Sequence, residues 1–319
     1  MPIARVELKD GRIVPVDDII QGKVRDSGFP ISFIRAALKE HLWDGSPHVT
    51  ALLNGTRETF LKYVSKYTLK LDQMAIAMAG TKFHANMEND VDLTELKISF
   101  DGIQGATDLL EVDPITGSLS ICDYKLVGSF ALKKWLGIVS KDVPVTDDFG
   151  NPVYLKSGKN AGQVKTKKEV RMDPAAADKF NYTMQTNIYR IIINAILADP
   201  KLLEKFPDLK GYEGQTVHAI NIFFVLRDGS INHDFSNNSY LEPVEILPDE
   251  EVNAFIEDRA GRIRLAMSTY TRLKEEGASN QDAVIKSCPP MCSAHETWYG
   301  RKCADYCSVS EACNHIGRS

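Results

Sequence analysis

The sequence contains no uninterrupted apolar run of membrane-spanning length. The longest candidate lies around Ile191–Leu197, and it is about a third of the length that a membrane-spanning helix needs. The first residues also lack the apolar core of a secretory signal. We therefore expect a soluble, cytoplasmic protein that has no membrane as a partner.

Positive charge is not in excess either. The 319 residues carry a net charge of −5, which argues against a surface that binds nucleic acid through general basic charge. Any contact with a polyanion must therefore use a local patch or bound metal ions. One such patch is present in Lys165–Lys168 together with Arg171. A solvated run of charge on an exposed loop is the alternative explanation for it.

Cysteine is scarce over most of the chain, because Cys122 alone precedes residue 288. The other five lie within the last 32 residues: Cys288, Cys292, Cys303, Cys307 and Cys313. This clustering is typical of a metal site in a reducing compartment, whereas a disulfide framework would be dispersed. Thiolates bind both zinc and iron–sulfur clusters, so the residue types leave the metal open. His295 and His315 are further possible ligands, and Cys122 is expected to be buried in a strand.

Hydrophobic periodicity divides the chain into a helical N-terminal region (1–79), a mixed core (80–247) and a C-terminal helix with the cysteine-rich segment (248–319). Helices are expected at Ile31–Leu42, Arg57–Tyr67, Met74–Glu88, Phe130–Ile138, Asp173–Leu197 and Asp249–Glu276. Strands are expected at Leu96–Asp101, Ile103–Val112, Leu119–Val127 and Thr216–Leu226. An exposed loop is expected around Asp147–Pro152 and Ser157–Gly162. The fold class is therefore mixed α/β, with a central mixed β-sheet flanked by helices.

Two carboxylates and a lysine are predicted to meet at one end of a β-hairpin. Asp108 precedes the turn at Asp113–Ser118, and Asp123 and Lys125 follow it. Because side chains alternate along a strand, Asp123 and Lys125 share a face. Mg²⁺ and Mn²⁺ prefer oxygen ligands, and a neighbouring lysine can position water or neutralise charge on a phosphate. An ordinary solvated pair on an edge strand is the plain alternative.

Four short motifs extend this pattern: Gly80-Thr-Lys-Phe-His84, Gly105-Ala-Thr-Asp108, Asp123-Tyr-Lys125 and Gln185-Thr-Asn-Ile-Tyr189. They resemble the G-x-x-x-H, G-x-x-D, D-Y-K and Q-x-x-x-Y segments of the PD-(D/E)xK nuclease superfamily. The order is most similar to the RecB-type exonuclease branch, which includes nucleases of CRISPR adaptation. The resemblance covers residues 80–227 directly and implies a restriction-endonuclease-like core.

The resemblance also implies a ligand set for Mn²⁺ or Mg²⁺: His84, Asp108, Asp123 and the carbonyl oxygen of Tyr124. It implies that Lys125 activates or positions water, and that Gln185 and Tyr189 support the site or touch the DNA backbone. A mixed set of imidazole and carboxylate ligands favours Mn²⁺ at least as much as Mg²⁺. The alternatives are a satisfied helix histidine at His84 and a plain polar pair at Gln185 and Tyr189.

Many RecB-type nucleases carry a [4Fe–4S] cluster with three cysteine ligands near the C-terminus and one far upstream. This sequence departs from that pattern, because Asn54–Arg57 stands where the family often has Cys-Pro-Arg. A fourth ligand must then come from Cys288 or Cys292, so the cluster would fix the C-terminal segment locally. The family's terminal triplet is matched by Cys303, Cys307 and Cys313. We expect an iron–sulfur cluster, with a structural Zn²⁺ as the alternative.

These features predict a metal-dependent DNA nuclease, an exonuclease, that hydrolyses phosphodiester bonds with a metal-activated water in DNA recombination, repair or processing. The implied partners are single-stranded DNA or duplex ends, further copies of the chain, and recombination or repair proteins. One alternative is a DNA-binding or assembly protein that retains the fold without catalysis. A redox protein that uses the cysteines is another, but it leaves the hairpin motif unexplained.

Overall fold

A computed structural model of the chain describes residues 3–24, 26–39, 42–88, 93–231 and 235–317. The fold is mixed α/β, as the sequence predicts. The chain divides into two compact units. The first comprises Met1–Tyr124, Asn181–Ile222 and Pro243–Ser319, and the second comprises Lys125–Phe180 and Phe223–Glu242.

The N-terminal region contains a small sheet that periodicity does not predict. Its strands are β1 (Ile3–Glu7), β2 (Ile13–Pro15) and β3 (Tyr67–Lys70), in the order β2-β1-β3. The prediction of a mainly helical region was therefore incomplete, because strands of three to five residues are too short to show a clear period of two. Val6 and Ile34 belong to the core between this sheet and its helices.

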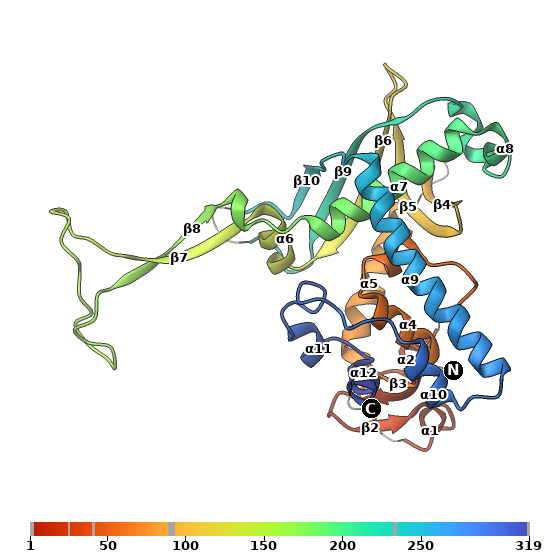
Figure 1. The fold of residues 1–319 in the computed structure, drawn as a ribbon. Helices are drawn as coiled ribbons and strands as arrows, with labels where there is room; N and C mark the ends of the chain where they lie inside the picture. The colour runs from red at the N-terminus through yellow and green to blue at the C-terminus, as the bar shows by residue number, and fades with distance from the viewer. Residues whose placement is uncertain (1–2, 25, 40–41, 89–92, 232–234, 318–319) are drawn as a thin grey trace. The chain divides into compact units, whose positions relative to one another are not determined.

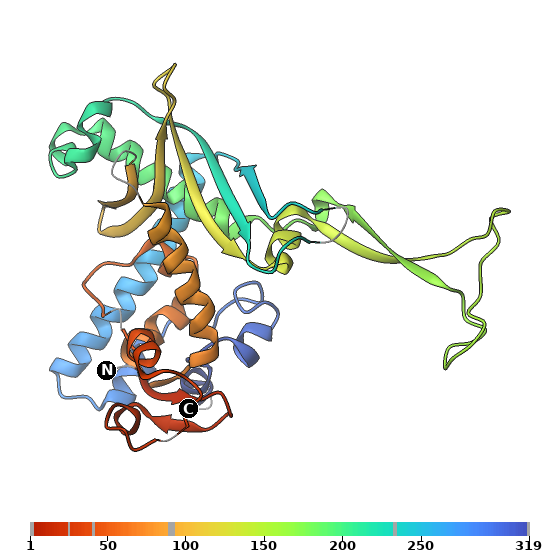
Figure 2. The ribbon, with the colours of Figure 1, turned by 180° about the vertical axis from the view of Figure 1, so that it is seen from behind.

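Helices in the same region follow the predicted order. They are α1 (Val16–Ile20), α2 (Ile31–Ala37), α3 (Val49–Leu52), α4 (Thr56–Val64) and α5 (Leu71–Met87). Residues 40 and 41 of the expected helix Ile31–Leu42 lie outside the described residues. The expected helix Arg57–Tyr67 ends earlier, because Ser65 is extended and Tyr67 enters β3. Figure 2 shows α5 rising from the small sheet toward β4.

A five-stranded sheet has the order β10-β9-β6-β5-β4. Its strands are β4 (Leu93–Phe100), β5 (Ile103–Val112), β6 (Leu119–Val127), β9 (Val217–Leu226) and β10 (Ser239–Pro243). The first three expected strands are confirmed as β4, β5 and β6, which pair in chain order as antiparallel neighbours. The expected strand Thr216–Leu226 is β9, which lies in the interior of the sheet. The boundary between the two units crosses β6, β9 and β10.

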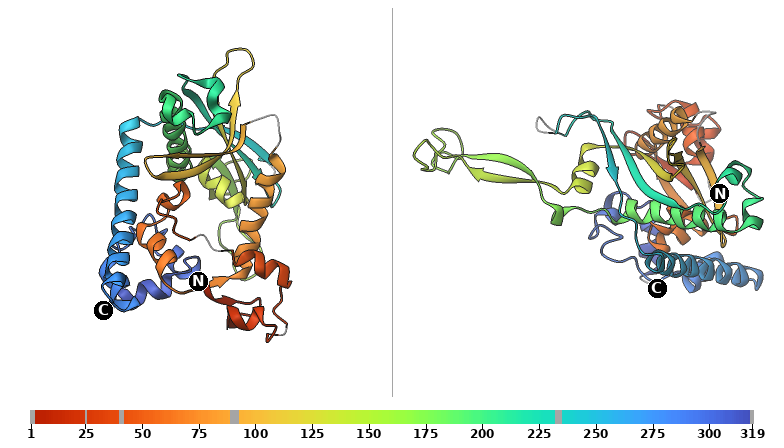
Figure 3. Two further views of the ribbon diagram at one scale, coloured as in Figure 1. Left: turned by 90° about the vertical axis from the view of Figure 1, so that its right-hand side faces the viewer. Right: turned by 90° about the horizontal axis from the view of Figure 1, so that it is seen from above.

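The first unit also contains the C-terminal helices. These are α7 (Phe180–Ala198), α8 (Pro200–Leu203), the 3₁₀ helix η2 (Pro207–Tyr212), α9 (Asp249–Glu275), α10 (Asn280–Ser287), α11 (Arg301–Asp305) and α12 (Ser310–Ile316). Helix α9 packs against α4 and α10 (Figure 3). The helix expected from Asp173 starts later, because Asp173 caps only the 3₁₀ turn η1 (Pro174–Ala176) before Ala177 is extended.

The second unit contains α6 (Ser129–Leu136) and a two-stranded ribbon of β7 (Ile138–Pro144) and β8 (Thr166–Met172) (Figure 1). The sequence predicts the helix and an exposed loop around Asp147–Pro152 and Ser157–Gly162, which lies between the two strands, but it does not predict the strands themselves. Charged residues occur on both faces of the ribbon, so no alternation of apolar and polar residues marks it. Within the described part of the chain, no helix is both long and apolar enough to cross a membrane.

A glycine allows α7 to approach the sheet closely. A Cβ atom on Gly105 of β5 would lie 2.8 Å from Cε1 of Tyr189 and 2.9 Å from Cγ2 of Val49. Tyr189 is buried on α7, and its hydroxyl accepts a hydrogen bond from Nε2 of Gln185 (3.1 Å). The glycine of the G-x-x-D motif therefore makes room for the tyrosine of the Q-x-x-x-Y motif.

We predict that Gly105→Ala destabilises the protein by about 1–3 kcal/mol, since the buried Tyr189 ring has no free space into which it can move. Denaturant unfolding measures the change. Gly80→Ala is the matched control, because a Cβ atom there meets nothing within 4 Å in helix α5. Its expected effect is a stabilisation of about 0.5–1 kcal/mol. Equal midpoints for Gly105→Ala and the wild type would contradict the close approach.

Candidate metal centre

Asp108 and Asp123 lie where the pairing of β5 with β6 ends. The register runs from Val112 opposite Leu119 to Leu109 opposite Cys122, and the two aspartates come directly beyond it. The backbone N–H of Tyr124 donates to Oδ2 of Asp108 at 2.7 Å. A buried N–H needs an acceptor, and here a carboxylate supplies it. Both aspartates are buried, with Asp108 7% and Asp123 1% exposed.

Glu95 lies opposite Asp108 on the neighbouring strand β4. Thr94 pairs with Leu109 and Leu96 with Thr107, which sets Glu95 across from Asp108 and on the same face of the sheet. The backbone of Glu95 has φ = +48°, a left-handed conformation that costs about 1–3 kcal/mol and is concentrated at functional sites.

The environment of Glu95 disfavours its charged form. Burial raises its pKa, and the Asp108 carboxylate raises it further, while His84 opposes the shift. A bound cation would relieve this repulsion between two neighbouring carboxylates.

His84 completes a group of three ligand side chains. Its Nδ1 atom, on α5, lies 3.1 Å from Oδ1 of Asp108 and 3.7 Å from Oε1 of Glu95. One ligand atom from each residue lies within 4.8 Å of the other two, which makes a metal ion possible at their centre. An open pocket of about 410 Å³ beside the group is lined by His84, Glu95, Gly80 and Glu88. Imidazole and carboxylate ligands suit Mn²⁺ well.

The sequence predicted His84 and Asp108 as ligands but did not identify Glu95. The predicted strand began at Leu96, whereas β4 begins at Leu93 and includes Glu95. The register of β4 with β5 would have identified Glu95, because the residue opposite Asp108 on an antiparallel strand lies on the same face of the sheet. Glu88, one turn beyond His84, is by sequence a lesser candidate for the site, with a solvated residue as the alternative. It is exposed directly after α5 and lines the same pocket.

The other predicted site residues have different positions. Asp123 is buried next to the end of the β5–β6 register but is not part of the group of three. Tyr124 contacts Asp108 through its backbone N–H, and its ring packs edge-on against Phe83, 6.4 Å between centroids. Lys125 follows on β6 as a half-buried residue and is the first residue of the second unit. The contacts of Tyr189 described above place α7 against β5.

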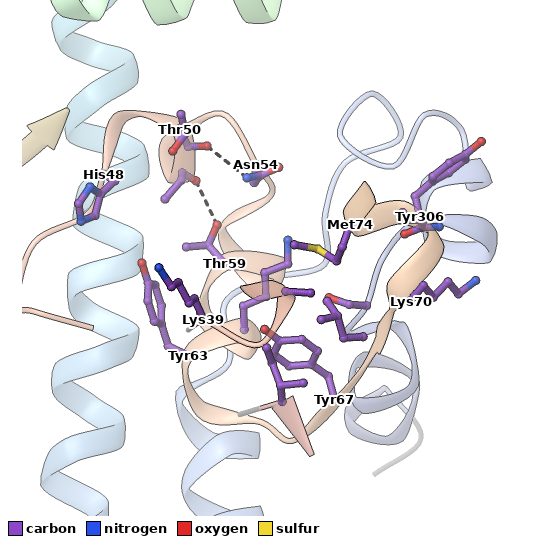
Figure 4. Close-up of a pocket in the computed structure, with 17 residues that line it drawn as sticks. Lys39, His48, Thr50, Asn54, Thr59, Tyr63, Tyr67, Lys70, Met74 and Tyr306 are labelled. Carbon is purple, nitrogen blue, oxygen red and sulfur yellow. Dashed lines mark hydrogen bonds between the residues drawn. The ribbon is translucent and has the colours of Figure 1, made fainter. Parts of the chain in front are cut away.

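A second hollow, of about 530 Å³, lies in the first unit away from this group (Figure 4). Its lining includes Lys39, His48, Tyr63, Tyr67 and Lys70. Some of its polar groups already have partners, since Nζ of Lys70 donates to the carbonyl oxygen of Asp305. The hollow is therefore a mixed polar and aromatic surface that is separate from the three ligand side chains.

The C-terminal cysteines gather around a small cavity. Its volume is about 60 Å³, and four thiols line it: Cys292, Cys303, Cys307 and Cys313. None of the six cysteines, all of which lie in the described part of the chain, forms a disulfide, and Cys122 is buried in β6 as expected. Burial raises the pKa of both Cys288 and Cys307 to about 11. These two thiols are therefore protonated at neutral pH unless a cation binds them.

Residues of helix α4 line one side of this cavity and form hydrogen bonds with the cysteine-rich segment. A Cβ atom on Gly55 would lie 2.3 Å from Sγ of Cys292, so the glycine backbone fits directly against that thiol. Nε of Arg57 donates to Sγ of Cys313 (3.1 Å), and Nη1 donates to the carbonyl oxygen of Pro289 (3.1 Å). The N-terminal region thus contacts the segment without supplying a cysteine.

A buried ion pair strengthens the same attachment. Glu58 on α4 pairs with Lys302 at 2.6 Å and with Lys62 at 2.7 Å. Burial raises the pKa of Glu58, but the two lysines outweigh that effect and hold the pKa below its ordinary value. The charged carboxylate is therefore stable in this site, and removal of one partner would leave an uncompensated buried charge.

We predict that Glu95→Gln weakens Mn²⁺ binding, because it removes one anionic ligand and preserves the size of the side chain. The loss should be at least about tenfold, which is typical of disturbing even an outer-shell partner of a metal. Titration calorimetry with Mn²⁺ measures it. Glu111→Gln is the control, since Glu111 is an exposed carboxylate on the same strand as Asp108. Equal affinity for Mn²⁺ in Glu95→Gln and wild type would remove Glu95 from the site.

Comparison with known proteins leaves the family open. No protein-family model matches the chain, and no curated protein matches it. One solved structure, described as "Crystal structure of SSO0001", aligns with 72% of this chain and 81% of its own, at 12% identity and a TM-score of 0.32. A similarity of that size does not establish a shared fold, so the assignment of function depends on the site itself.

Proposed function

We propose that the protein is a divalent-metal-dependent DNA nuclease, an exonuclease, with its centre at His84, Glu95 and Asp108. The observation that carries the proposal is the convergence of these three ligands from α5, β4 and β5 beside an open pocket. Two of them belong to motifs that resemble those of RecB-type nucleases. Glu95 adds a second carboxylate, the hard oxygen ligand that Asp108 also supplies.

The residues of such a site would have two roles, which are to bind the metal ion and to position the phosphate and the water. Mn²⁺ or Mg²⁺ held there would polarise a phosphate ester and make water a better nucleophile. Asp108 and Glu95 supply anionic oxygens, and His84 supplies a nitrogen. Asp123 adds negative charge directly beyond the paired part of β5 and β6. Lys125, two residues further along β6, provides a positive charge for a phosphate or its attacking water.

A binding protein without catalysis explains the site less well. Two carboxylates on one face repel a polyanion, and Coulomb repulsion in a partly buried site is several times stronger than in water. A cation between carboxylates and phosphate reverses the sign of that interaction. Binding alone has no use for this arrangement, whereas metal-assisted phosphodiester hydrolysis uses a cation next to the phosphate.

We predict Mn²⁺- or Mg²⁺-dependent cleavage of end-labelled linear DNA, and a loss of at least about a hundredfold in Asp108→Asn, Asp123→Asn and Lys125→Ala, each of which removes a charge of the proposed centre. Glu111→Gln should retain the wild-type rate. An exonuclease degrades linear DNA and leaves closed circular DNA intact. DNA binding without metal-dependent cleavage by the wild type would favour the binding protein.

We also propose that the C-terminal cysteines bind a metal, as an iron–sulfur cluster or as Zn²⁺. Four thiols around one cavity support this, because four cysteines complete either kind of site. The favoured ligands are those four, with Cys292 in place of an upstream cysteine. Its thiol lies against Gly55, within the segment Asn54–Arg57 that stands where the related nucleases have their upstream ligand.

We predict that protein purified without oxygen contains bound metal, and that Cys303→Ala loses it while Cys288→Ala retains it. The reason is that Cys288 is not among the four thiols that line the cavity. Analysis of iron, acid-labile sulfide and zinc distinguishes a cluster from Zn²⁺, and visible absorption identifies the cluster independently. A metal-free wild type, or equal loss in both variants, would contradict the proposed ligand set.

A further inference from the structure

The ribbon formed by β7 and β8, together with the residues that connect them, is here called the arm (138–172). It belongs wholly to the second unit. Figures 1 and 3 show it as a narrow two-stranded element whose end opens into two loops. Six of the seven residues of β8 are exposed, and Phe149 near the end is 88% exposed. An exposed ribbon of this kind needs a reason for its stability, since an isolated hairpin is only marginally stable in water.

The root of the arm is anchored to a packed core. Trp135 of α6 is 1% exposed, and its ring lies 5.5 Å from that of Phe224. At the base of the ribbon, the backbone N–H of Asp173 donates to the carbonyl oxygen of Gly137 (2.8 Å). Gly137 has φ = +68°, and a Cβ atom there would lie 2.2 Å from the carbonyl oxygen of Asp173. The two strands therefore leave a fixed base side by side.

The shaft and the end of the arm are ordered by hydrogen bonds and paired charges. Seven residue pairs form the ladder, among them Lys141 opposite Glu169 and Asp142 opposite Lys168. Beyond the ladder, the N–H of Val145 donates to the carbonyl oxygen of Lys165, and that of Lys165 donates to Val153. Seven residues at about 3.3 Å each give the shaft a length of about 23 Å. The arm is thus a regular, hydrogen-bonded β-hairpin rather than an unstructured loop.

The arm differs from the rest of the chain in the sign of its net charge. It contains seven lysine and arginine residues and four acidic residues, so its net charge is +3 in a chain of net charge −5. Two of the acids face lysines across the ladder. Positions two apart share a face, so Lys167 and Arg171 of β8 lie on one face with Lys165, which directly precedes β8. These three residues are here called the basic stripe. Glu169 lies on the same face, and Lys141 stands opposite it in the ladder. Within the described residues, the three side chains of the basic stripe form no ion pair.

We propose that the arm binds duplex DNA, with the basic stripe on the phosphate backbone. A two-stranded ribbon fits the major groove, which is about 12 Å wide. Lysine and arginine on an exposed strand supply the phosphate contacts that dominate affinity for DNA. The arm contains 11 charged residues against three large exposed apolar side chains, Phe149, Tyr154 and Met172, and charged residues are depleted in the core of interfaces with protein partners. The choice of DNA as the polyanion rests on the proposed nuclease function, but the contact itself needs neither metal nor catalysis.

Binding of a fluorescent 30-base-pair duplex, measured by anisotropy in EDTA with the Asp123→Asn variant, tests the proposal without cleavage. The triple substitution Lys165→Gln, Lys167→Gln and Arg171→Gln should weaken binding about tenfold or more at 100 mM salt. It should also reduce the slope of log affinity against log salt by up to about 3, one for each lost phosphate contact.

Two matched variants isolate the effect of the stripe. Lys201→Gln, Lys205→Gln and Lys210→Gln make the same change of charge at exposed positions on α8, after it and on η2, and should alter affinity less than twofold. Lys165→Arg, Lys167→Arg and Arg171→Lys keep the charge and should bind as the wild type does.

Equal weakening by the two glutamine triples would overturn the proposal, as would tighter binding of single-stranded DNA that the stripe does not affect. A wild type that binds no duplex would overturn it as well. Because all binding is measured without metal, none of these outcomes depends on whether the protein cleaves DNA.

Discussion

The hydrogen bond from the backbone of Tyr124 to the carboxylate of Asp108 fixes the geometry on which the candidate centre depends. It uses Oδ2 and leaves Oδ1 directed toward His84, 3.1 Å from Nδ1. One oxygen therefore has a structural role, and the other is available as a ligand. The bond forms where the β5–β6 register ends, so a backbone group that would otherwise lack a strand partner orients the side chain instead. A carboxylate held in this way has already lost most of its conformational freedom, so metal binding would cost little further entropy.

A different set of polar contacts joins the cysteine-rich segment to the N-terminal region. Arg57 reaches a thiol and a backbone carbonyl of the segment, and Glu58 pairs with Lys302. Because Arg57 and Glu58 are both buried, each would be costly to leave unpaired. The sequence suggested that a cluster could fix this segment only locally. The contacts from α4 now provide the long-range attachment, which depends on charge and hydrogen bonds rather than on an upstream cysteine.

The sequence predicted the elements that carry strong periodicity. Helix α9 and strands β5, β6 and β9 lie close to their expected bounds, because long apolar patterns are set by burial on one face. Helix α5 also lies close to its expected bounds, although Leu71 is its one buried residue. The sequence did not predict β1, β2 and β3, which are too short to show a period, or β7 and β8, whose two faces are both charged. Glu95 was not predicted as a ligand for a related reason. Its position becomes meaningful only through pairing with Asp108, and register between strands is not visible in either strand alone.

The distribution of charge connects the two proposals in physical terms. Without the arm, whose net charge is +3, the rest of the chain carries a net charge of −8. A proposed centre built from carboxylates adds to the repulsion of a polyanion until a cation is bound.

Under the two proposals, affinity for DNA would come from a positively charged element that is distinct from the carboxylates. Screening limits the electrostatic field of each group to about 8–10 Å at physiological salt. Attraction to DNA by the arm and cleavage by the metal centre would therefore respond differently to salt. Salt weakens the first through its phosphate contacts, whereas the second depends on short-range coordination that screening affects little.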